Sequence, residues 1–380
     1  MPLRCTLHVG APKTGSSSIQ DAFFFDLRNP GFHYACGGDL NGSVALTTIY
    51  ETPPDDQWVY LARGWFTHSF EVYRSRFERG LKRAFRHAVE RRSHLIISGE
   101  SAWLFSRDAM IRLRDELQSL GFDIQVVAYV RPWASWNTSI LQQTLKSGRQ
   151  SIHTRSKRIR STTDVKQPLE RFFDVFGREQ VSVHLFAPSR FPGGCVVRHF
   201  CEQIGFPVPD NLQWRSNETL SLPAAQLMFA YNRYGGPVGE FAPPVPRGYG
   251  ELPEKLQGLT EPKFQLHSSL LNPLLEERVD EDAWLQKELG ISLLPDRPLV
   301  DAEHSVATDD DMINFSPSTL EWLAKATHSS VIKRTTPAET ARAVAMQMDQ
   351  LRQRPITPWE RLARLRKRLR TRSILFFKKY

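Results

Sequence analysis

LHVGAPKTGSSSIQ, residues 7–20, has the layout of a loop that wraps a phosphate group. Gly10 and Gly15 keep the spacing of the two glycines in such loops. The apolar run from Cys5 to Val9 predicts a strand before the loop, and apolar residues at helical spacing follow it. The loop is thus expected to open a helix whose first N–H groups face an anion. This order of elements predicts a nucleotide-binding α/β core.

The lysine of this loop does not stand where a kinase has it. In the loop G-x-x-x-x-G-K-[ST], the lysine directly follows the second glycine, and the next hydroxyl binds Mg²⁺. Here Ser16 takes the place of that lysine, and the only lysine of the loop is Lys13. The run from Thr14 to Ser18 still offers hydroxyl groups to a phosphate. The displaced lysine indicates a phosphate loop with a chemistry other than that of a kinase.

A second motif lies at residues 124–139, IQVVAYVRPWASWNTS. Its β-branched and apolar first half is typical of a buried parallel strand that ends at Arg131. Ser139 follows eight positions later, where a helix is expected. Arginine offers phosphate oxygens a planar, permanently charged fork, and a hydroxyl near a helix start lies beside the positive end of the dipole. The pair suits a second phosphate site.

Together the two motifs resemble those of sulfotransferases that use 3′-phosphoadenosine 5′-phosphosulfate (PAPS). The loop of that family reads P-K-[TS]-G-[TS]-[TS], which residues 12–17, PKTGSS, match. In the family, an arginine at a strand end and a serine eight residues later hold the 3′-phosphate of the donor. The resemblance extends to about Gly205, with a further similar segment at residues 215–221. It implies these donor-binding residues: Lys13, Thr14, Gly15, Ser16, Ser17, Ser18, Arg131 and Ser139.

The resemblance implies in-line transfer of a sulfuryl group from PAPS to a hydroxyl, or less readily to an amine. Lys13 and the N–H groups of the loop are expected to stabilise charge on the leaving phosphate. A sulfuryl group carries less negative charge than a phosphoryl group, so we expect no metal ion. A glycan or glycolipid is the first expectation for the acceptor, because tryptophans stack on sugar rings, although they suit a core or a lid equally well. The tryptophans concerned are Trp58, Trp65, Trp103, Trp133 and Trp136.

The sequence leaves two candidates for the general base that accepts the proton of the acceptor. Glu100 directly follows the strand predicted at His94 to Ser98, at the sheet edge where the site is expected, and is the first choice. His33, in the second predicted strand, is the second choice because a histidine titrates near neutrality. Glu100 could instead have a structural role, as a carboxylate that caps the next helix or pairs with a site arginine. His33 could instead be a half-buried strand residue.

The order of elements predicts an α/β fold with a doubly wound, mostly parallel sheet around a P-loop-type core. Residues 37–77 show little periodicity and are expected to form loops over the site, and residues 146–160 a mobile loop. The donor-binding core is placed at residues 1–220, and a helical extension of the same domain, which helps to form the acceptor pocket, at 221–354. The remaining predicted elements are strands at 31–35, 126–130 and 181–186 and helices at about 77–92, 106–120, 169–176 and 196–204.

The positive charge of the chain is concentrated at one end. Of a formal net charge of +9, residues 361–380 contribute nine Lys or Arg and no acid, so the rest of the chain is close to neutral. Residues 355–380 begin with two prolines, and leucines then recur at helical spacing among arginines. Such a basic amphipathic tail suits an anionic membrane surface, and equally a helix packed on the body or on a second subunit. Nucleic acid is not expected as a partner, because no recognition motif accompanies the charge.

The absence of targeting and membrane-spanning segments predicts a cytoplasmic enzyme. Arg361 to Tyr380 are expected to make peripheral contact with the inner membrane surface. The sequence shows neither a signal peptide nor an apolar run of about 18 residues, the length that spans a bilayer. Its four cysteines lack C-x-x-C spacing, which predicts reduced thiols and no metal site. The oligomeric state is not set by the sequence.

Two alternative functions are considered beside the sulfotransferase. A P-loop kinase or nucleotidase with a degenerate loop needs an Mg²⁺-holding aspartate after a hydrophobic strand, whereas Gly99-Glu100 and Arg131-Pro132 follow those strands here. A non-catalytic, membrane-associated scaffold with the same fold has no need for Lys13, Arg131 and Ser139 together.

Overall fold

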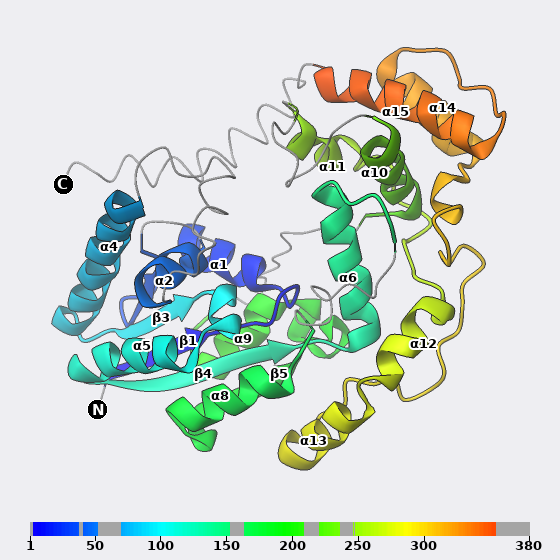
Figure 1. Cartoon of the computed structure of the whole chain (residues 1–380). Coiled ribbons are helices and arrows are strands. Elements are labelled where there is room, and N and C mark those ends of the chain that lie inside the picture. Colours follow the sequence, from blue (N-terminus) through cyan, green and yellow to red (C-terminus); the bar gives the residue numbers. More distant parts are fainter. Residues whose placement is uncertain are drawn as a thin grey trace.

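The computed structural model describes residues 3–37, 41–51, 70–152, 163–208, 220–235, 246 and 248–354 of the 380-residue chain. Within these residues, parallel strands form a five-stranded sheet in the order β2-β3-β1-β4-β5 (Figure 1). The strands are β1 (Leu3–His8), β2 (Phe32–Ala35), β3 (His94–Ser98), β4 (Phe122–Val130) and β5 (Val181–Leu185). The predicted parallel α/β sheet is confirmed.

Strands β1 and β4 lie side by side, and the chain leaves them in opposite directions. After β1 it moves to the edge strand β2, and after β4 to the opposite edge strand β5. Their pairing runs from Leu3 beside Phe122 to His8 beside Val127. In doubly wound sheets, ligands bind in the crevice that such a reversal opens at the carboxyl ends of the strands. The fold therefore brings the loops after β1 and β4, which carry the two sequence motifs, to the same place.

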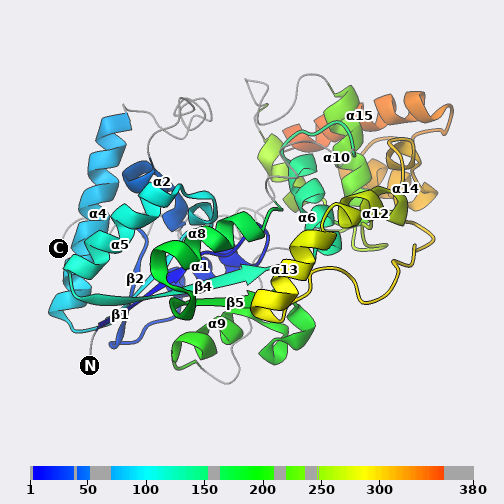
Figure 2. The same cartoon turned by 60° about the horizontal axis from the view of Figure 1, so that its bottom comes forward.

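Helices cover both faces of the sheet, as Figure 2 shows. Alternate residues of the strands supply the two cores: Cys5 and Leu7 face one layer of helices, and Val127 and Tyr129 face the other. The first layer comprises α2 (Gly42–Tyr50), α4 (Phe70–Glu90), α5 (Arg107–Ser119) and α8 (Lys166–Phe176), and the second comprises α1 (Ser16–Phe25) and α9 (Val196–Ile204).

The prediction of loops over residues 37–77 is wrong for the part that the structure describes. Helix α2 occupies Gly42–Tyr50, and residues 38–40 and 52–69 lie outside the described residues. The sequence of α2 has no charged residue and therefore no polar face to reveal a helical period. Asn41 caps the helix by accepting the Ser43 N–H at 2.9 Å, and Leu46 is fully buried. Packing on the end of the sheet stabilises this helix.

The ends of other elements differ from the predictions by a few residues. Helix α4 begins at Phe70 instead of residue 77, and β4 begins at Phe122 instead of residue 126. An exposed charged residue lies in each added part, Glu71 in α4 and Asp123 in β4, and masks the apolar pattern. Lys146 belongs to the last turn of a helix and not to a loop, and residues 153–160 lie outside the described residues.

The predicted helical extension follows the sheet. Serine and threonine residues mark its helix starts: Ser221 accepts the Ala224 N–H, and Thr336 forms a capping box with Glu339. Figure 1 shows α10, α14 and α15 grouped at one side of the sheet. The helices are α10 (Leu222–Tyr234), α11 (Leu252–Lys255), α12 (Ser268–Glu276), α13 (Val279–Leu289), α14 (Pro317–Thr327) and α15 (Pro337–Gln353).

Helix α6 (Trp133–Lys146) belongs to the sheet and to the extension at once. Its first half places Trp136 in the core beneath the sheet, and its second half places Leu141 and Leu145 in the core of the extension. The side-chain amide of Asn232 on α10 donates to the carbonyl of Leu145 at 2.8 Å. The extension therefore fixes the carboxyl end of α6.

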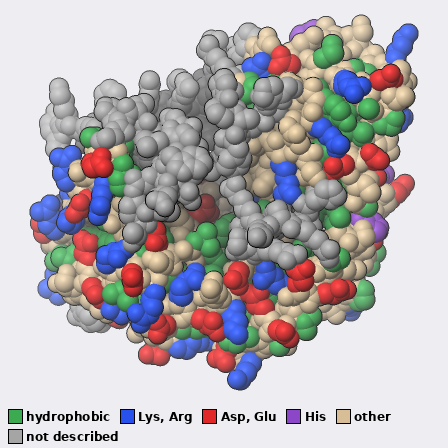
Figure 3. All heavy atoms as spheres, viewed as in Figure 1, with side chains coloured by type: hydrophobic (Ala, Val, Ile, Leu, Met, Phe, Trp, Pro, Cys, Tyr) green, Lys and Arg blue, Asp and Glu red, His purple; other side chains and the backbone are tan. Residues whose placement is uncertain are grey.

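The surface of the body carries charges of both signs. Figure 3 shows Lys and Arg side chains interspersed with Asp and Glu side chains over the face in view. Among the described helices, none has the length and apolar character required to cross a membrane. The basic tail, residues 355–380, lies outside the described residues.

Three of the tryptophans considered for sugar stacking are core residues. Trp103, Trp133 and Trp136 have no solvent-exposed surface. Trp103 and Trp133 also satisfy their indole N–H groups within the protein, by donating to the carbonyls of Asp164 at 3.4 Å and Thr163 at 3.0 Å. These rings fill the interior and do not contact an acceptor. Trp58 and Trp65 lie outside the described residues.

Replacement of a core tryptophan is expected to lower stability strongly. Trp103→Ala should reduce the free energy of unfolding by about 3–5 kcal/mol, because it leaves a large cavity. The neighbouring Leu104 is 57% exposed, so Leu104→Ala serves as the control and should cost less than about 1 kcal/mol. Urea unfolding of the two variants measures the difference. Equal, small losses would show that the Trp103 ring is not part of the core.

Candidate functional site

The loop after β1 has a backbone conformation that side chains rarely adopt. Lys13 has φ 71°, in the left-handed region, where a residue other than glycine is strained and often functional. Gly15 has φ 86° and is the N-cap of α1. Left-handed residues in a short loop turn successive N–H groups to one side and form a concavity for anions. The hydroxyl of Thr14 locks this loop by donating to the carbonyl of Ala11 at 2.5 Å.

Helix α1 begins at this loop. The N–H groups of Ser18 and Ile19 donate to the carbonyl of Gly15, whereas those of Ser16 and Ser17 come before the first helical hydrogen bond. The side chain of Ser17 is exposed, and that of Ser18 is buried. The positive end of the helix, with N–H groups that lack helical acceptors, therefore faces the loop.

Two buried polar atoms beneath the loop have no hydrogen-bond partner among the described residues, namely Ser16 Oγ and His8 Nε2. Both approach Gly10, where a Cβ atom would lie 2.6 Å from Ser16 Oγ and 3.2 Å from His8 Nε2, so only glycine fits. His8 is held from its other side by a 2.7 Å hydrogen bond between Nδ1 and Ser98 Oγ. Unpaired buried polar atoms cost free energy. The hydroxyl of Ser16 fits an anion bound in the loop.

The structure joins the two sequence motifs by a hydrogen bond. Nη1 of Arg131 donates to the carbonyl of Lys13 at 2.9 Å, and Nε donates to Ser135 Oγ at 3.0 Å. The guanidinium also lies over the ring of Phe186, 5.5 Å from its centroid. Burial lowers the pKa of Arg131 to about 10, so the group stays charged at neutral pH. Its planar fork is thus fixed where the loops after β1 and β4 meet.

The serine of the second motif lies on a polar face of α6. Ser139 is 7% exposed and lies one turn after Ser135 on the same face of the helix. Gln143, one turn further, accepts a hydrogen bond from Lys13 Nζ at 3.3 Å. Gln143 was not predicted as a site residue, because it belongs to neither motif. Its four-residue spacing from Ser139 indicates only that the two residues share a face of the helix.

Glu100 lies at the carboxyl end of β3, where it begins the 3₁₀ turn η1 (Glu100–Leu104). Helix α2 fixes this turn, since Ser101 donates to Ser43 twice, from its N–H to Oγ at 3.1 Å and from its hydroxyl to the carbonyl at 3.0 Å. Burial raises the pKa of the Glu100 carboxyl, and the nearby Lys13 ammonium opposes the rise. A carboxyl with a raised pKa beside a lysine is suited to proton transfer.

Positive charge exceeds negative charge around Lys13. The pKa of Lys13 is lowered to about 8, mainly by burial; Lys146 and Arg131 also lower it, whereas Glu100 opposes the change. Three cations and one carboxylate therefore act on one another at the carboxyl edge of the sheet. Such an excess of buried positive charge is stable when an anion binds there.

His33 does not lie with these residues. It is in the edge strand β2 and pairs with Leu95, three residues before the carboxyl end of β3 at Ser98. Its ring contacts that of His87 on α4, with 4.9 Å between the centroids. The pKa of His33 is lowered to about 4, mainly by burial and also by His87 and Arg28. The structure thus places His33 against a helix, as a half-buried strand histidine, and not beside Lys13.

Phe186, directly after β5, supports both motifs and was not found from the sequence. Its ring lies close to Gly15, where a Cβ atom would be 2.9 Å from Phe186 Cε2 and 2.9 Å from Val196 Cγ1. The same ring lies under the guanidinium of Arg131. A single phenylalanine after an edge strand carries no sequence signal, because its role comes from packing.

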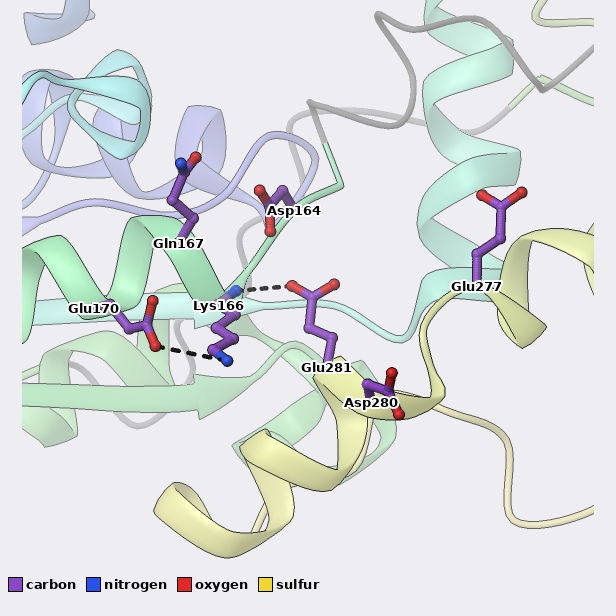
Figure 4. Close-up of a pocket in the computed structure, with 7 residues that line it drawn as sticks. All are labelled: Asp164, Lys166, Gln167, Glu170, Glu277, Asp280 and Glu281. Atoms are coloured by element: carbon purple, nitrogen blue, oxygen red, sulfur yellow. Dashed lines mark hydrogen bonds and ion pairs between the residues drawn. The ribbon is translucent and has the colours of Figure 1, made fainter.

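A pocket of about 300 Å³ between α8 and α13 has a structural role (Figure 4). Glu281 accepts the N–H groups of Val165 and Lys166 at 2.6 and 2.7 Å, and so caps α8. Within the described part of the chain, no group of three His, Cys, Asp or Glu is placed to hold a metal ion. The pocket is lined by Asp164, Lys166, Gln167, Glu170, Glu277, Asp280 and Glu281, none of them from the loop.

The fold and the loop define an α/β protein with a parallel sheet, in which left-handed residues between β1 and α1 form a tight loop at the carboxyl edge. Neither a protein-family model nor a curated protein sequence matches the chain. The chain is similar to a solved sulfotransferase from Alicyclobacillus acidocaldarius, at 20% identity over 61% of this chain and 93% of that one, with a TM-score of 0.34. It is also similar to the sulfotransferase domain from the curacin biosynthetic pathway, at 11% identity over 73% and 98% of the two chains, with a TM-score of 0.32. Because both TM-scores are low, the function proposed below rests on the residues of this chain.

A methyl group at Gly15 is expected to distort the loop. The ligand for the test is adenosine 3′,5′-bisphosphate, which is PAPS without its sulfuryl group. Gly15→Ala should weaken its binding roughly 10- to 100-fold, because the left-handed φ and the clash with Phe186 both oppose the side chain. Gly205→Ala is the matched control, since Gly205 has φ 69° and no atom within 4 Å of a Cβ. Calorimetry measures binding, and thermal unfolding checks that both variants fold. Equal affinities of the two variants would contradict the role given to the loop.

Proposed function

We propose that this protein is a sulfotransferase that moves a sulfuryl group from PAPS to an acceptor hydroxyl. The observation that carries the proposal is the 2.9 Å hydrogen bond from Arg131 to the carbonyl of Lys13. It brings the second phosphate motif to the displaced lysine of the first. PAPS has phosphate groups on the 3′ and 5′ oxygens of one ribose, so its recognition requires two phosphate sites at this short separation.

The residues around this hydrogen bond suit the two ends of the donor. Lys13 and the N–H groups of Thr14 to Ser17 are proposed to hold the 5′-phosphosulfate, with the unpaired hydroxyl of Ser16 as a further donor. Arg131 and Ser139 are proposed to hold the 3′-phosphate. The hydroxyl of Thr14 is committed to the carbonyl of Ala11, so Thr14 contributes its N–H group to the ligand.

The side chains of this site have separate tasks in the transfer. When bound, PAPS supplies an activated sulfuryl group joined to phosphate through a bridging oxygen. The ammonium of Lys13 stabilises the negative charge that develops on the leaving phosphate. The carboxylate of Glu100 accepts the proton of the attacking hydroxyl. The two phosphate sites hold the donor in line with the acceptor. That the reaction needs no metal ion stays a prediction.

The acceptor is proposed to be a glycan or a lipid-linked hydroxyl compound. With Trp103, Trp133 and Trp136 in the core, the remaining candidates for sugar stacking among the five tryptophans are Trp58 and Trp65, which lie outside the described residues. A cytoplasmic location and membrane contact through residues 355–380 are proposed from the sequence of the tail alone.

The kinase alternative has less support from the strand ends. The residues that follow β3 and β4 are Gly99-Glu100 and Arg131-Pro132, and Arg131 fills the position next to the loop. A kinase places an Mg²⁺-binding aspartate at such a strand end. We therefore expect a ligand with a second phosphate and not Mg-ATP.

The test of the donor is the binding of adenosine 3′,5′-bisphosphate without Mg²⁺. The wild type is expected to bind it, and Arg131→Ala should weaken binding roughly 100-fold through the loss of charged hydrogen bonds. Arg178→Ala is the matched control. Arg178 also donates to carbonyls, those of Val181 and Glu288, and lies over a phenylalanine ring, but it stands at the start of β5 and not beside the loop. Calorimetry with ATP and Mg²⁺ as the competing ligand distinguishes a sulfotransferase from a kinase. A preference for Mg-ATP would sink the sulfotransferase proposal.

The rate of donor consumption is expected to depend on pH through Lys13 and Glu100. Lys13 must be charged, so kcat/KM should fall as the pH rises through about 8, the lowered pKa of this lysine in the free protein. Glu100 must be ionised, and its raised pKa should place the acidic limb above the usual carboxyl range. Radiolabelled PAPS measures transfer to water and to a panel of hydroxyl compounds.

The variant Glu100→Gln tests whether Glu100 is the general base or has only a structural role. The variant should lose roughly 100-fold or more in rate and also the acidic limb, as expected for removal of a general base. Its affinity for adenosine 3′,5′-bisphosphate should stay close to that of the wild type. An unchanged acidic limb in the variant would assign the proton transfer to another group.

A further inference from the structure

Helix α6 presents a row of polar side chains to the phosphate loop. Ser135, Ser139, Gln143 and Lys146 follow one another at intervals of four, four and three residues, which places them on one face of the helix. Contacts at two points show where this face is directed. Ser135 accepts from Arg131, and Gln143 accepts from the ammonium of Lys13. The row therefore runs along the loop, and Lys146 is its last member.

Lys146 is held near Lys13 by a rigid part of the fold. It lies in the last turn of α6, one turn after the glutamine that contacts Lys13. The amide of Asn232, which is fully buried, donates to the carbonyls of Leu145 and Arg149 at 2.8 and 2.9 Å and fixes this turn. Among charged neighbours, the Lys146 ammonium has the largest effect on the pKa of Lys13, ahead of Glu100 and Arg131.

The charge of Lys146 is not compensated within the described part of the chain. No carboxylate there forms an ion pair with it, and burial lowers its pKa. Two ammonium groups that repel each other, partly removed from water, are a costly arrangement without an anion between them. The pair of Lys13 and Lys146 therefore indicates a subsite for an anionic group.

The position of Lys146 along α6 decides which anionic group this is. A helix rises about 1.5 Å per residue, so Lys146 lies roughly 10 Å along the axis from Ser139. Lys13 contacts Gln143, one turn before Lys146, so Lys146 lies beyond the proposed 3′-phosphate site and on the side of Lys13. The group that Lys13 faces is the 5′-phosphosulfate, whose outer end is the sulfuryl group.

We propose that Lys146 is a second cationic catalytic residue, which contacts the non-bridging oxygens of the sulfuryl group while Lys13 contacts the leaving phosphate. This inference rests on the proposed function and adds a residue outside the two motifs. During transfer, the bond between sulfur and the bridging oxygen breaks, and its electron pair stays on the phosphate oxygen. A bond forms between sulfur and the acceptor oxygen, whose proton passes to Glu100, and no atom changes its oxidation state. Lys146 keeps its protons and holds the sulfuryl oxygens in line.

The test compares two ligands that differ by the sulfuryl group. Lys146→Met should weaken PAPS binding roughly 10- to 100-fold, the effect of one lost hydrogen bond to a charged group. Binding of adenosine 3′,5′-bisphosphate, which lacks the sulfuryl group, should change less than about threefold. Retained bisphosphate binding also shows that the variant is folded. Lys146→Arg should recover part of the PAPS affinity, because it restores a positive donor.

Lys325→Met is the matched control. Lys325 is an exposed lysine in the last turn of α14, so its loss changes the net charge and the helix end in the same way. This variant should bind both ligands like the wild type. Stopped-flow or quenched reactions with radiolabelled PAPS should also show a lower transfer rate for Lys146→Met and an unchanged rate for Lys325→Met.

Three outcomes distinguish this inference from the proposed function. If the wild type binds neither ligand, the proposed function fails, and the role of Lys146 fails with it. If the wild type binds both and Lys146→Met weakens both equally, Lys146 belongs to a phosphate site and the inference is overturned. If Lys146→Met binds PAPS like the wild type, Lys146 does not contact the sulfuryl group, and the sulfotransferase proposal still stands.

Discussion

The hydrogen bond between the guanidinium of Arg131 and the carbonyl of Lys13 is the interaction on which the site depends. Lys13 has a left-handed backbone, a strained conformation that persists only when its surroundings hold it. The partner that holds it comes from the loop after β4 and is itself supported by the ring of Phe186. Because β1 and β4 are adjacent and the chain leaves them in opposite directions, one arginine spans the crevice. The start of α1 and the position of the Lys13 ammonium follow from this connection.

The parts of the site that the sequence predicted are those defined by local spacing. The glycine spacing of the loop, the apolar strands before it and before Arg131, and the eight residues to Ser139 are each a property of a short segment. The parallel order of the strands then brings strand ends together, so the meeting of the two loops could also be expected. Glu100 was located by the same argument, since it lies two residues after the end of β3.

The parts that the sequence did not predict depend on packing between distant segments. Trp136 and His33 belong to residue types that occur both in cores and in sites, and only the folded chain shows that the first is buried and the second faces α4. Helix α2 has no polar face, and Phe186 has no motif, so neither carries a period or a spacing. Gln143 stands at a helical interval from Ser139, but a sequence does not tell which face of a helix meets a loop.

Helix α6 takes part in two hydrophobic cores, and this limits how the protein can be divided or recombined. A fragment that ended with the sheet would expose Leu141 and Leu145 to water and would remove Asn232 from the end of α6. An exchange of the extension for that of another protein would have to rebuild the same contacts. Changes in the extension are therefore constrained by the sheet and its loops, because both parts depend on the placement of one helix.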